Sequence, residues 1–302
     1  MKLNLDHLLV VDAIATHGSF AAAAQVLHRV PSALTYNVQK LEQDLSVQLF
    51  DRSGHRAVLT LAGVTLLKEG RYLLEAAREL EARVQRVAAG IEVELRIAVS
   101  DLIDWSVFYQ GLNAFYAQDL GTRLRVSTEV FGGCWDALVD GRADLVIGAP
   151  SDGPAGGGYV THLLGVVEFV FAVAPHHPLA SYHEPLQNID IIKFRAVSAA
   201  DSSRQLPVRT SGLIKGQDVL SLPNMTAKLL AQEQGLGVGY LPKSLATAAQ
   251  EKGSLVIKTV AEPKPITQFF MAWNSHHNGL ALAWLVDYWK SHAIFEDADI
   301  VS

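Results

Sequence analysis

The stretch from Gly18 to Thr60 constrains the fold of this chain most. It reads GSFAAAAQVLHRVPSALTYNVQKLEQDLSVQLFDRSGHRAVLT. A first helix is expected before this stretch, and Gly18 should end it. Ser19 is a suitable N-cap for the next helix, and the alanine run behind it favours a helix to about Leu27 with little side-chain bulk. Pro31 suits the first position of a second helix, because its φ is fixed near the helical value and its missing N–H would have no partner there. Two short helices joined by about three residues predict a helix-turn-helix.

The second of these helices should have one apolar and one polar face. Its apolar residues recur at helical spacing and are Leu34, Val38, Leu41 and Leu45. The other face carries hydroxyls, an amide, a phenol and an ammonium, which can contact base edges and phosphates in a major groove. These groups belong to Ser32, Thr35, Tyr36, Asn37 and Lys40. A generic helical hairpin with a solvated polar face would show the same pattern.

A short hairpin should follow this helix. The segment DRSGHR contains a glycine turn and lies between Phe50 and the extended run AVLT. Basic side chains stand near its tip, namely Arg52, His55 and Arg56. Such a hairpin is typical of a wing that contacts the DNA backbone or the minor groove. The order of helix-turn-helix, wing and long helix favours DNA binding over a generic hairpin, with Ser19 and Pro31 included among the candidate DNA-binding residues.

A long helix is expected from Leu61 to about Ala89. Apolar residues recur in it every seven positions, at Leu66, Leu73, Leu80 and Val87, and are joined by Ala77 and Val84. Sustained sevenfold spacing indicates packing along a partner helix. A single amphipathic helix lying on its own domain is the alternative. Pairing is favoured, since a helix of roughly 28 residues is about 42 Å long and too long for a small domain to cover.

From residue 91 the chain alternates strand and helix patterns. The β-branched runs at 95–100, 124–131 and 143–149 lack strict alternation, as expected of strands covered on both faces. Helical patterns at 105–118 and 135–140 lie between them, so these strands should be parallel.

A second series of strand patterns follows a glycine-rich loop at 151–160. The expected strands lie at 169–175, 195–199, 236–242, 255–260 and 268–273, and further helices at 225–234 and 280–290. Two α/β lobes with a ligand cleft between them are therefore predicted, because ligands of open α/β sheets bind beyond the carboxyl ends of the strands.

Polar side chains and backbone N–H groups stand at three of these strand ends. The candidate effector-binding residues are Ser100, Asp101, Leu102, Phe131, Gly132, Trp135, Ser202, Ser203 and Arg204. Hydroxyls and N–H groups near helix starts favour an anionic or polar ligand, and Arg204 can hold a carboxylate. Asp101 is an unusual neighbour for an anion, so a neutral or aromatic effector stacked on Phe131 or Trp135 stays open. Each residue alone fits an N-cap or a surface ion pair as well.

Several of these segments resemble one family. The run GSF-x-x-AA, the helix ending in KLEQDL, the segment LFDRSGHR and the following LT-x-AG are similar to the N-terminal domain of LysR-type transcriptional regulators. The similarity continues more loosely through nearly the whole chain, and HRVPSAL and LFDRSGHR are most similar to the YhaJ/AllS-like branch. Many members have Gln at the start of the recognition helix and Arg in its middle. This chain has Pro31 and Tyr36 there, so it lacks a bidentate donor to guanine.

The resemblance implies a domain organisation. Residues 1–60 would form a winged helix-turn-helix, 61–90 a linker helix that dimerises the protein, and 91–302 an effector-binding domain like a type 2 periplasmic binding protein. Lobe I would comprise about 91–164 and 268–302, and lobe II about 165–267, with crossovers near 164–168 and 264–268. Double-stranded DNA, a small metabolite or aromatic effector, a second copy of the chain in a dimer or tetramer, and RNA polymerase would be its partners.

Composition is consistent with this organisation. The net charge of −6 divides into +1 for residues 1–90 and −7 for 91–302, so one DNA-binding domain should bind only modestly and dimerisation should help. The single cysteine, Cys134, excludes an intramolecular disulfide and reads as a core residue. Neither a signal peptide nor a membrane span is expected, so the cytoplasm is the predicted location.

Other classes of function lack their motifs. The His176–His177 and His276–His277 pairs have no partner at metal-ligand spacing, and Gly235 in GLGVG reads as a helix C-cap rather than as part of a dinucleotide fingerprint. No metal or cofactor is therefore expected. A binding or transport protein would not explain the first 90 residues, and an α/β enzyme would need a nucleophile or cofactor motif. A ligand-responsive regulator that binds an inverted-repeat operator is the favoured interpretation.

Overall fold

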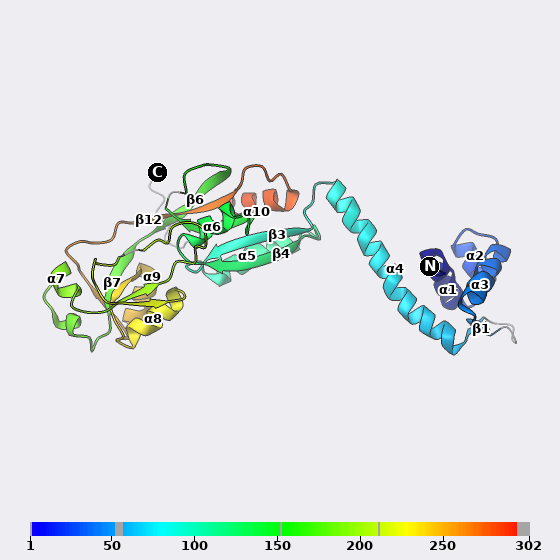
Figure 1. The fold of residues 1–302 in the computed structure, drawn as a ribbon, viewed down its shortest axis with the longest axis horizontal. Coiled ribbons are helices and arrows are strands. Elements are labelled where there is room, and N and C mark those ends of the chain that lie inside the picture. Colours follow the sequence, from blue (N-terminus) through cyan, green and yellow to red (C-terminus); the bar gives the residue numbers. More distant parts are fainter. Residues whose placement is uncertain (1, 52–56, 152, 211, 295–302) are drawn as a thin grey trace. The chain divides into compact units, whose positions relative to one another are not determined.

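The computed structural model describes residues 2–51, 57–151, 153–210 and 212–294. The chain divides into two compact units, Met1–Ala88 and Ala89–Ser302, which are described separately below (Figure 1).

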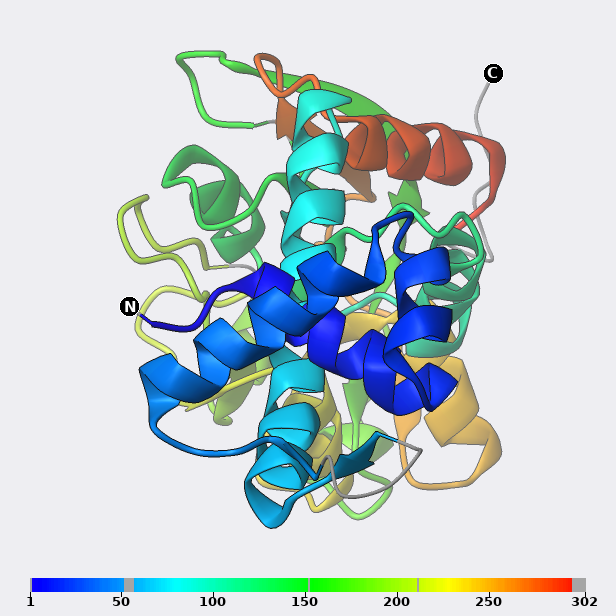
Figure 2. The same ribbon diagram turned by 90° about the vertical axis from the view of Figure 1, so that its right-hand side faces the viewer.

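The first unit is built on three short helices that pack against one another (Figures 1 and 2). They are α1 (Leu5–His17), α2 (Phe20–Val26) and α3 (Pro31–Leu45). The predicted caps are confirmed: Gly18 ends α1 at a φ of 74°, Ser19 Oγ accepts from Ala22 N at 3.1 Å, and Pro31 begins α3. The core of the unit is apolar and fully buried, with Val10, Ile14, Ala23, Ala24, Leu34, Val38 and Leu41 at its centre.

A two-stranded hairpin and a long helix complete this unit. β1 (Phe50–Asp51) pairs antiparallel with β2 (Val58–Leu59), as the wing requires, and the tip residues Arg52, His55 and Arg56 lie outside the described residues. The helix α4 (Leu61–Ala88) begins directly after the hairpin. A Cβ on Gly63 would clash with the carbonyl oxygen of Leu49, and one on Gly70 would lie 2.7 Å from Leu8 Cδ2. Both glycines therefore let the first half of α4 pack closely on the rest of the unit.

The second half of α4 leaves its apolar residues uncovered within this chain. Leu73, Leu80, Val84 and Val87 are between 51% and 60% exposed, whereas Leu74, on the side that faces the core, is buried. Apolar side chains exposed in a row along one helix mark a surface that is available to a partner.

The second unit contains a mixed five-stranded sheet in the order β4-β3-β5-β12-β6. Its strands are β3 (Glu94–Ser100), β4 (Arg123–Glu129), β5 (Leu145–Pro150), β6 (Tyr159–Val167) and β12 (Thr267–Asn274). β3 is parallel to β4 and β5, as predicted, whereas β12 runs antiparallel to β5 and β6.

Helices cover both faces of this sheet. α5 (Trp105–Tyr116) and α10 (Leu280–Ser291) share one core with Ile97, Ile147 and Met271. α6 (Gly133–Val139) shares another core with Ala98, Val146 and Ala272, whose side chains alternate with the first set along the strands. Burial on both faces explains the continuous apolar runs of these strands.

A second region of the same unit is built around β7 (Phe169–Val173). β10 (Gly239–Pro242) and β11 (Val256–Lys258) pair antiparallel with β7 on its two sides. A short parallel pair, β8 (Ala196–Ala199) and β9 (Val219–Leu222), joins this region through a bridge from Ala196 to Val238. Its helices are η1 (Pro178–Ser181), α7 (Asn188–Ile191), α8 (Met225–Glu233) and α9 (Lys243–Glu251).

The chain passes between the two sheets twice. It leaves the five-stranded sheet after Val167 at the end of β6 and enters the other with Phe169 at the start of β7. It returns with Thr267 at the start of β12, after the segment 261–266. The two-lobed α/β architecture expected from the sequence is confirmed.

Several elements were not predicted. β6 begins at Tyr159, inside the expected glycine-rich loop, and β9, α7 and α9 had no counterpart in the sequence reading. β6 lies at the edge of its sheet and contains a polar stretch and Gly165, so it lacks the continuous apolar signal of the central strands. α9 buries only Ala246 and Ala249, which gives a weak periodic pattern.

In the part of the chain that the structure describes, no single helix is long and apolar enough to cross a membrane. Taken together, α1 and α2 would satisfy the criteria of length and composition, but they are separated by a bend of 117°.

Candidate DNA-binding face and effector site

The outer face of α3 presents the polar residues that the sequence singled out. Ser32, Tyr36 and Lys40 are exposed, and Tyr36 is 66% exposed. Thr35 is half-buried, and its Oγ1 donates to Pro31 O at 3.0 Å. Leu34, Val38 and Leu41 on the other side of the helix are fully buried, so the polar face is held outward by the packing of the apolar one.

Asn37 has an internal contact that the sequence did not reveal. Its Nδ2 donates to Asp6 Oδ2 at 3.0 Å, and the guanidinium of Arg29 binds the same carboxylate at 2.7 and 2.9 Å. The hydrogen bond from Arg29 lowers the pKa of Asp6. These three residues connect the start of α1, the turn before α3 and the middle of α3. Asn37 therefore helps to position α3, and Asp6 and Arg29 support it.

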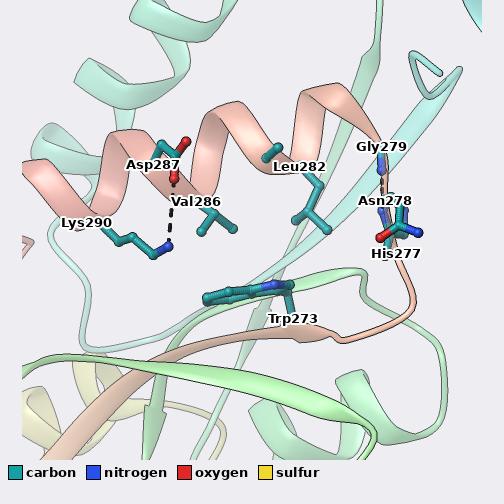
Figure 3. A pocket seen from close by; sticks show the side chains of 9 residues that line it. Trp273, His277, Asn278, Gly279, Leu282, Val286, Asp287 and Lys290 are labelled. Carbon is teal, nitrogen blue, oxygen red and sulfur yellow. Dashed lines mark hydrogen bonds and ion pairs between the residues drawn. The ribbon is translucent and has the colours of Figure 1, made fainter. Parts of the chain in front are cut away.

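A cavity of about 380 Å³ lies in the second unit between β12 and α10 (Figure 3). Trp273 lies below Leu282 and Val286 of the helix, and Lys290 pairs with Asp287 at 3.7 Å. The predicted effector-binding residues do not line this cavity. Among the described residues, no group of three or more His, Cys, Asp or Glu side chains is placed to hold a metal ion.

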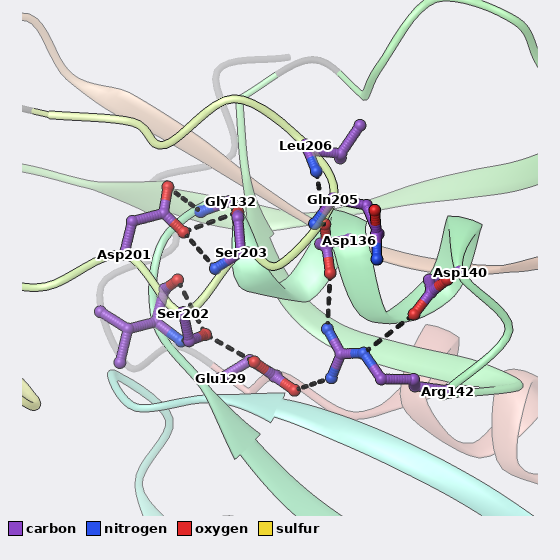
Figure 4. Close-up of polar contacts among 11 residues, drawn as sticks. Glu129, Gly132, Asp136, Asp140, Arg142, Asp201, Ser202, Ser203, Gln205 and Leu206 are labelled. Atoms are coloured by element: carbon purple, nitrogen blue, oxygen red, sulfur yellow. Dashed lines mark hydrogen bonds and ion pairs between the residues drawn. The ribbon is translucent and has the colours of Figure 1, made fainter.

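The predicted effector-binding residues meet where the two sheets approach each other. Ser202, which follows β8, binds the end of β4: Val130 N donates to Ser202 Oγ at 2.8 Å, and Ser202 Oγ donates to Glu129 Oε2 at 2.5 Å (Figure 4). Ser202 N also donates to Val130 O at 3.2 Å.

Asp201 gathers a second set of donors at the same place. Its carboxylate accepts from Gly132 N at 3.3 Å and from Ser203 N and Oγ at 2.8 and 2.7 Å (Figure 4). It also accepts from Arg209 N at 2.6 Å. The prediction that Gly132, Ser202 and Ser203 lie close together is confirmed. In this structure their polar groups connect the two lobes to each other.

Arg142 forms ion pairs with two carboxylates next to this junction. Its guanidinium lies 2.5 Å from Glu129 Oε1 and 2.7 Å from Asp136 Oδ2, and both carboxylates are buried (Figure 4). Asp136 also accepts from Gln205 N and Leu206 N, each at 2.7 Å. Burial raises the pKa of Asp136, but the backbone donors and Arg142 outweigh it and hold this pKa at about 2. No local sequence pattern points to Arg142, because its partners Glu129 and Asp136 lie on other elements.

The remaining candidates have different surroundings. Ser100 is buried, Leu102 and Phe131 are half-buried in an apolar cluster at the junction, and Arg204 is exposed. Asp101 Oδ2 accepts from Met225 N at 2.7 Å, at the first turn of α8, and burial raises the pKa of this carboxyl.

The expectation that Trp135 stacks on an effector requires correction. Trp135 is 0% exposed, its Nε1 donates to Pro150 O at 2.9 Å, and its ring packs against Tyr159. A large aromatic ring enclosed on α6 by the β-sheet leaves no face for a ligand. Cys134 beside it is buried in the same core, as predicted.

Two family models match the chain, and together they cover both units. Residues 5–64 match the bacterial regulatory helix-turn-helix protein of the lysR family, and residues 88–293 match the LysR substrate binding domain. The chain belongs to the LysR family of transcriptional regulators. It is a DNA-binding regulator with an effector-binding domain.

Curated relatives of this LysR-type regulator occur in Escherichia coli K12. The uncharacterized HTH-type transcriptional regulator YeeY is 42% identical over 95% of this chain and 93% of its own length. The probable regulator YhaJ is 38% identical over 93% of this chain and 94% of its own length, and PunR is 36% identical over 93% and 91%. The predicted similarity to YhaJ is confirmed.

Solved structures show the same fold. A probable transcriptional regulator from Pseudomonas aeruginosa is similar with a TM-score of 0.60 and 22% identity, over 97% of this chain and 98% of that one. The LysR family regulator CbnR gives a TM-score of 0.53 at 20% identity, over 95% and 100% of the two chains.

The ion-pair network at the junction predicts the effect of Arg142→Met. Removing the guanidinium leaves the carboxylates of Glu129 and Asp136 buried without their cation, which should destabilise the second unit by about 3–5 kcal/mol. All five tryptophans lie beyond residue 100, so urea unfolding followed by tryptophan fluorescence reports this unit. Arg125→Met, on an exposed position of β4, is the matched control and should change stability little.

The same variant has a predicted pH dependence. Asp136 stabilises the folded state above its ordinary pKa of 3.8, and this contribution is lost as the pH falls towards about 2. The difference in the free energy of unfolding between wild type and Arg142→Met should therefore become smaller as the pH falls over that range. Two results would show that the ion pairs of Arg142 do not stabilise this unit. One is a difference in the free energy of unfolding that stays constant with pH, and the other is an unfolding midpoint of Arg142→Met equal to that of Arg125→Met.

Proposed function

We propose that this regulator contacts duplex DNA with the outer face of α3, pairs through α4, and responds to a small molecule bound at the junction of its two lobes. The observation that carries the proposal is the exposure of Ser32, Tyr36 and Lys40 on a helix whose opposite face is fully buried. A hydroxyl, a phenol and an ammonium on one solvent-facing side of a short helix suit contacts with base edges and phosphates.

The charge of the first 90 residues supports a cooperative mode of binding. With a net charge of only +1, one copy neutralises few phosphates, and affinity grows with the number neutralised. A pair of copies doubles that number and matches an inverted-repeat operator. The wing residues Arg52, His55 and Arg56 and the N-cap Ser19 complete the proposed contacts. The cytoplasm, where DNA and RNA polymerase are accessible, is the proposed location.

The DNA-binding proposal is tested by Lys40→Ala. We expect weaker binding to the regulator's own upstream region in gel shifts, because one phosphate contact is lost per copy. The slope of log affinity against log salt should fall by about 1 for each lost contact. Lys40 is exposed, and the described residues form no hydrogen bond or ion pair with its side chain, so the thermal stability should not change.

Lys252→Ala is the matched control, because Lys252 is an exposed lysine at the end of α9 in the other unit. Equal affinities and equal salt slopes for Lys40→Ala and Lys252→Ala would reject the role of this face of α3. Binding of wild type that does not respond to salt would argue against a phosphate-contacting mode altogether.

The exposed apolar row on α4 supports pairing of two copies along this helix. Its members Leu73, Leu80 and Val87 repeat every seven residues, and they are exposed although they are apolar. We propose a dimer formed in this way, and a tetramer in which two dimers also associate through other surfaces. RNA polymerase is the proposed partner of the assembled regulator at the promoter.

Pairing is tested by Leu80→Asp. Burial of a leucine is worth about 1.5–3 kcal/mol, so a charge at this position should raise the dissociation constant of the dimer by at least about tenfold. Sedimentation equilibrium measures the shift. Gln85→Asp places the same charge on an exposed position outside the apolar row and should leave the assembly intact. Identical association of the two variants would exclude α4 as the dimer helix.

The effector is proposed to bind where Ser100, Asp101, Leu102, Phe131 and the loop with Gly132 and Ser202–Arg204 come together. The hydrogen bonds of Ser202 and Asp201 join the lobes there. A ligand that replaces some of these contacts changes the preferred closure of the lobes and thereby the activity of the regulator. The family assignment disfavours a stand-alone binding protein or an enzyme.

A further inference from the structure

Lys228 on α8 is a buried cation without a counter-charge. Its residue is 5% exposed, and its Nζ lies 3.6 Å from the position that a Cβ on Gly239 would occupy. In the described part of the chain, no acceptor lies within hydrogen-bonding distance of this Nζ and no carboxylate forms an ion pair with it. Burying an ammonium costs free energy unless it is paired and hydrogen-bonded.

A second buried lysine, in contrast, is paired with a carboxylate and hydrogen-bonded. Lys258 on β11 is 7% exposed, and its Nζ lies 2.9 Å from Glu184 Oε1. The same Nζ donates to Ala180 O and Tyr182 O, each at 3.1 Å. Lys258 is thus fully satisfied by the protein, whereas Lys228 is not.

Lys264 adds a further cation near Lys228. It lies on the segment that returns from the second sheet to β12, and its Nζ lies 3.5 Å from the centre of the Phe169 ring. Burial lowers the pKa of Lys264 to about 8. Burial, followed by the repulsion from Lys264, lowers the pKa of Lys228 to about 7. The positive charge of Lys264 therefore acts unfavourably on the ammonium of Lys228.

Asp101 does not neutralise these two lysines. Asp101 attracts Lys228, but its Oδ2 already accepts from Met225 N at the start of α8, and it lies beyond ion-pair distance of Lys228. Leu102, Phe131, Phe169 and Tyr240 belong to the apolar cluster at the same junction of the lobes. The site therefore combines an excess of positive charge with an apolar surface.

We propose that Lys228 and Lys264 bind an anionic group of the effector, a carboxylate or a phosphate, with its apolar part against the cluster that contains Phe131. This inference rests on the proposed sensing of a small molecule at the lobe junction and names the chemical class of that molecule. An anion would supply the acceptor that Lys228 lacks and would relieve the repulsion between the two lysines.

The test compares acids with their neutral amides. Thermal unfolding of the full-length protein is followed with malonate and malonamide, benzoate and benzamide, and inorganic phosphate, and then with a wider panel of paired carboxylates, amides and phosphate esters. We expect at least one anion to raise the Tm of wild type by several degrees at about 100 times its dissociation constant. The matching neutral compound should leave the Tm unchanged. The response to carboxylates and to phosphates distinguishes the two sources of the anion.

Lys228→Met and Lys264→Met test the residues, and Lys252→Met is the exposed control. Lys228→Met and Lys264→Met should both lose the shift caused by the anion, and the control should keep it. Without ligand, Lys228→Met should have a Tm equal to or above that of wild type, since methionine fills the same space without an uncompensated charge. This readout separates a ligand-binding lysine from one that the fold needs.

Three results would overturn the proposal. The first is an anion-induced shift that persists in Lys228→Met and Lys264→Met, and the second is a panel in which no anion stabilises wild type more than these variants. The third is a Tm of ligand-free Lys228→Met several degrees below that of wild type. A neutral compound that raises the Tm in all variants would preserve effector sensing and reject only the anionic class, whereas DNA binding is judged separately by the gel shifts.

Discussion

The close crossing of α1, α2 and α3 is the constraint on which the first unit depends. Ala23 and Ala24 are fully buried between the helices, and larger side chains there would push α3 away from α1. Because the apolar stripe of α3 is fixed in this way, its polar residues have to face solvent. The carboxylate of Asp6 then fixes the helix further, since it binds both Arg29 in the turn and Asn37 in the middle of α3. The exposure of the polar residues of α3 is therefore a consequence of how its apolar residues pack.

In the second unit, polar contacts join the two lobes beside the apolar cluster that contains Phe131. The two lobes meet through Ser202, Asp201 and their partners at the end of β4, and Arg142 balances the buried charge beneath them. Hydrogen bonds of this kind can be exchanged for contacts with a ligand at low net cost, whereas an apolar interface of the same size would resist opening. Lys228 departs from this balance, because its side chain is buried and none of the described residues supplies an acceptor for it. The proposed effector site should therefore favour an anionic ligand, because an anion would pair with the ammonium of Lys228.

Sequence patterns identified the elements whose signals are local. Ser19, Pro31 and Gly18 mark helix ends by their own backbone and side-chain chemistry, and the structure confirms each of them. The central strands were visible because burial on both faces demands continuous apolar runs. By contrast, β6 and β9 lack such runs, so their pairing partners alone define them as strands. The roles of Asp6, Arg142 and Lys228 depend on residues far away in the sequence, and no periodicity or spacing encodes such contacts. The prediction for Trp135 was wrong for a different reason. Its position near a strand end indicated a ligand contact, but the large apolar ring is packed in the core.

Contact between the outer face of α3 and DNA can be measured at Tyr36. Tyrosine side chains are oxidised by hydroxyl radicals at rates that follow their exposure, and Tyr36 is 66% exposed while Tyr116 on α5 is 58% exposed. Mass spectrometry of the protein footprinted with and without a bound duplex, selected by the protein from random fragments, compares the two. The oxidation of Tyr36 should fall several-fold on DNA binding, while that of Tyr116 should stay constant. Unchanged oxidation of Tyr36 in a protein that is saturated with DNA would contradict contact of this face with DNA.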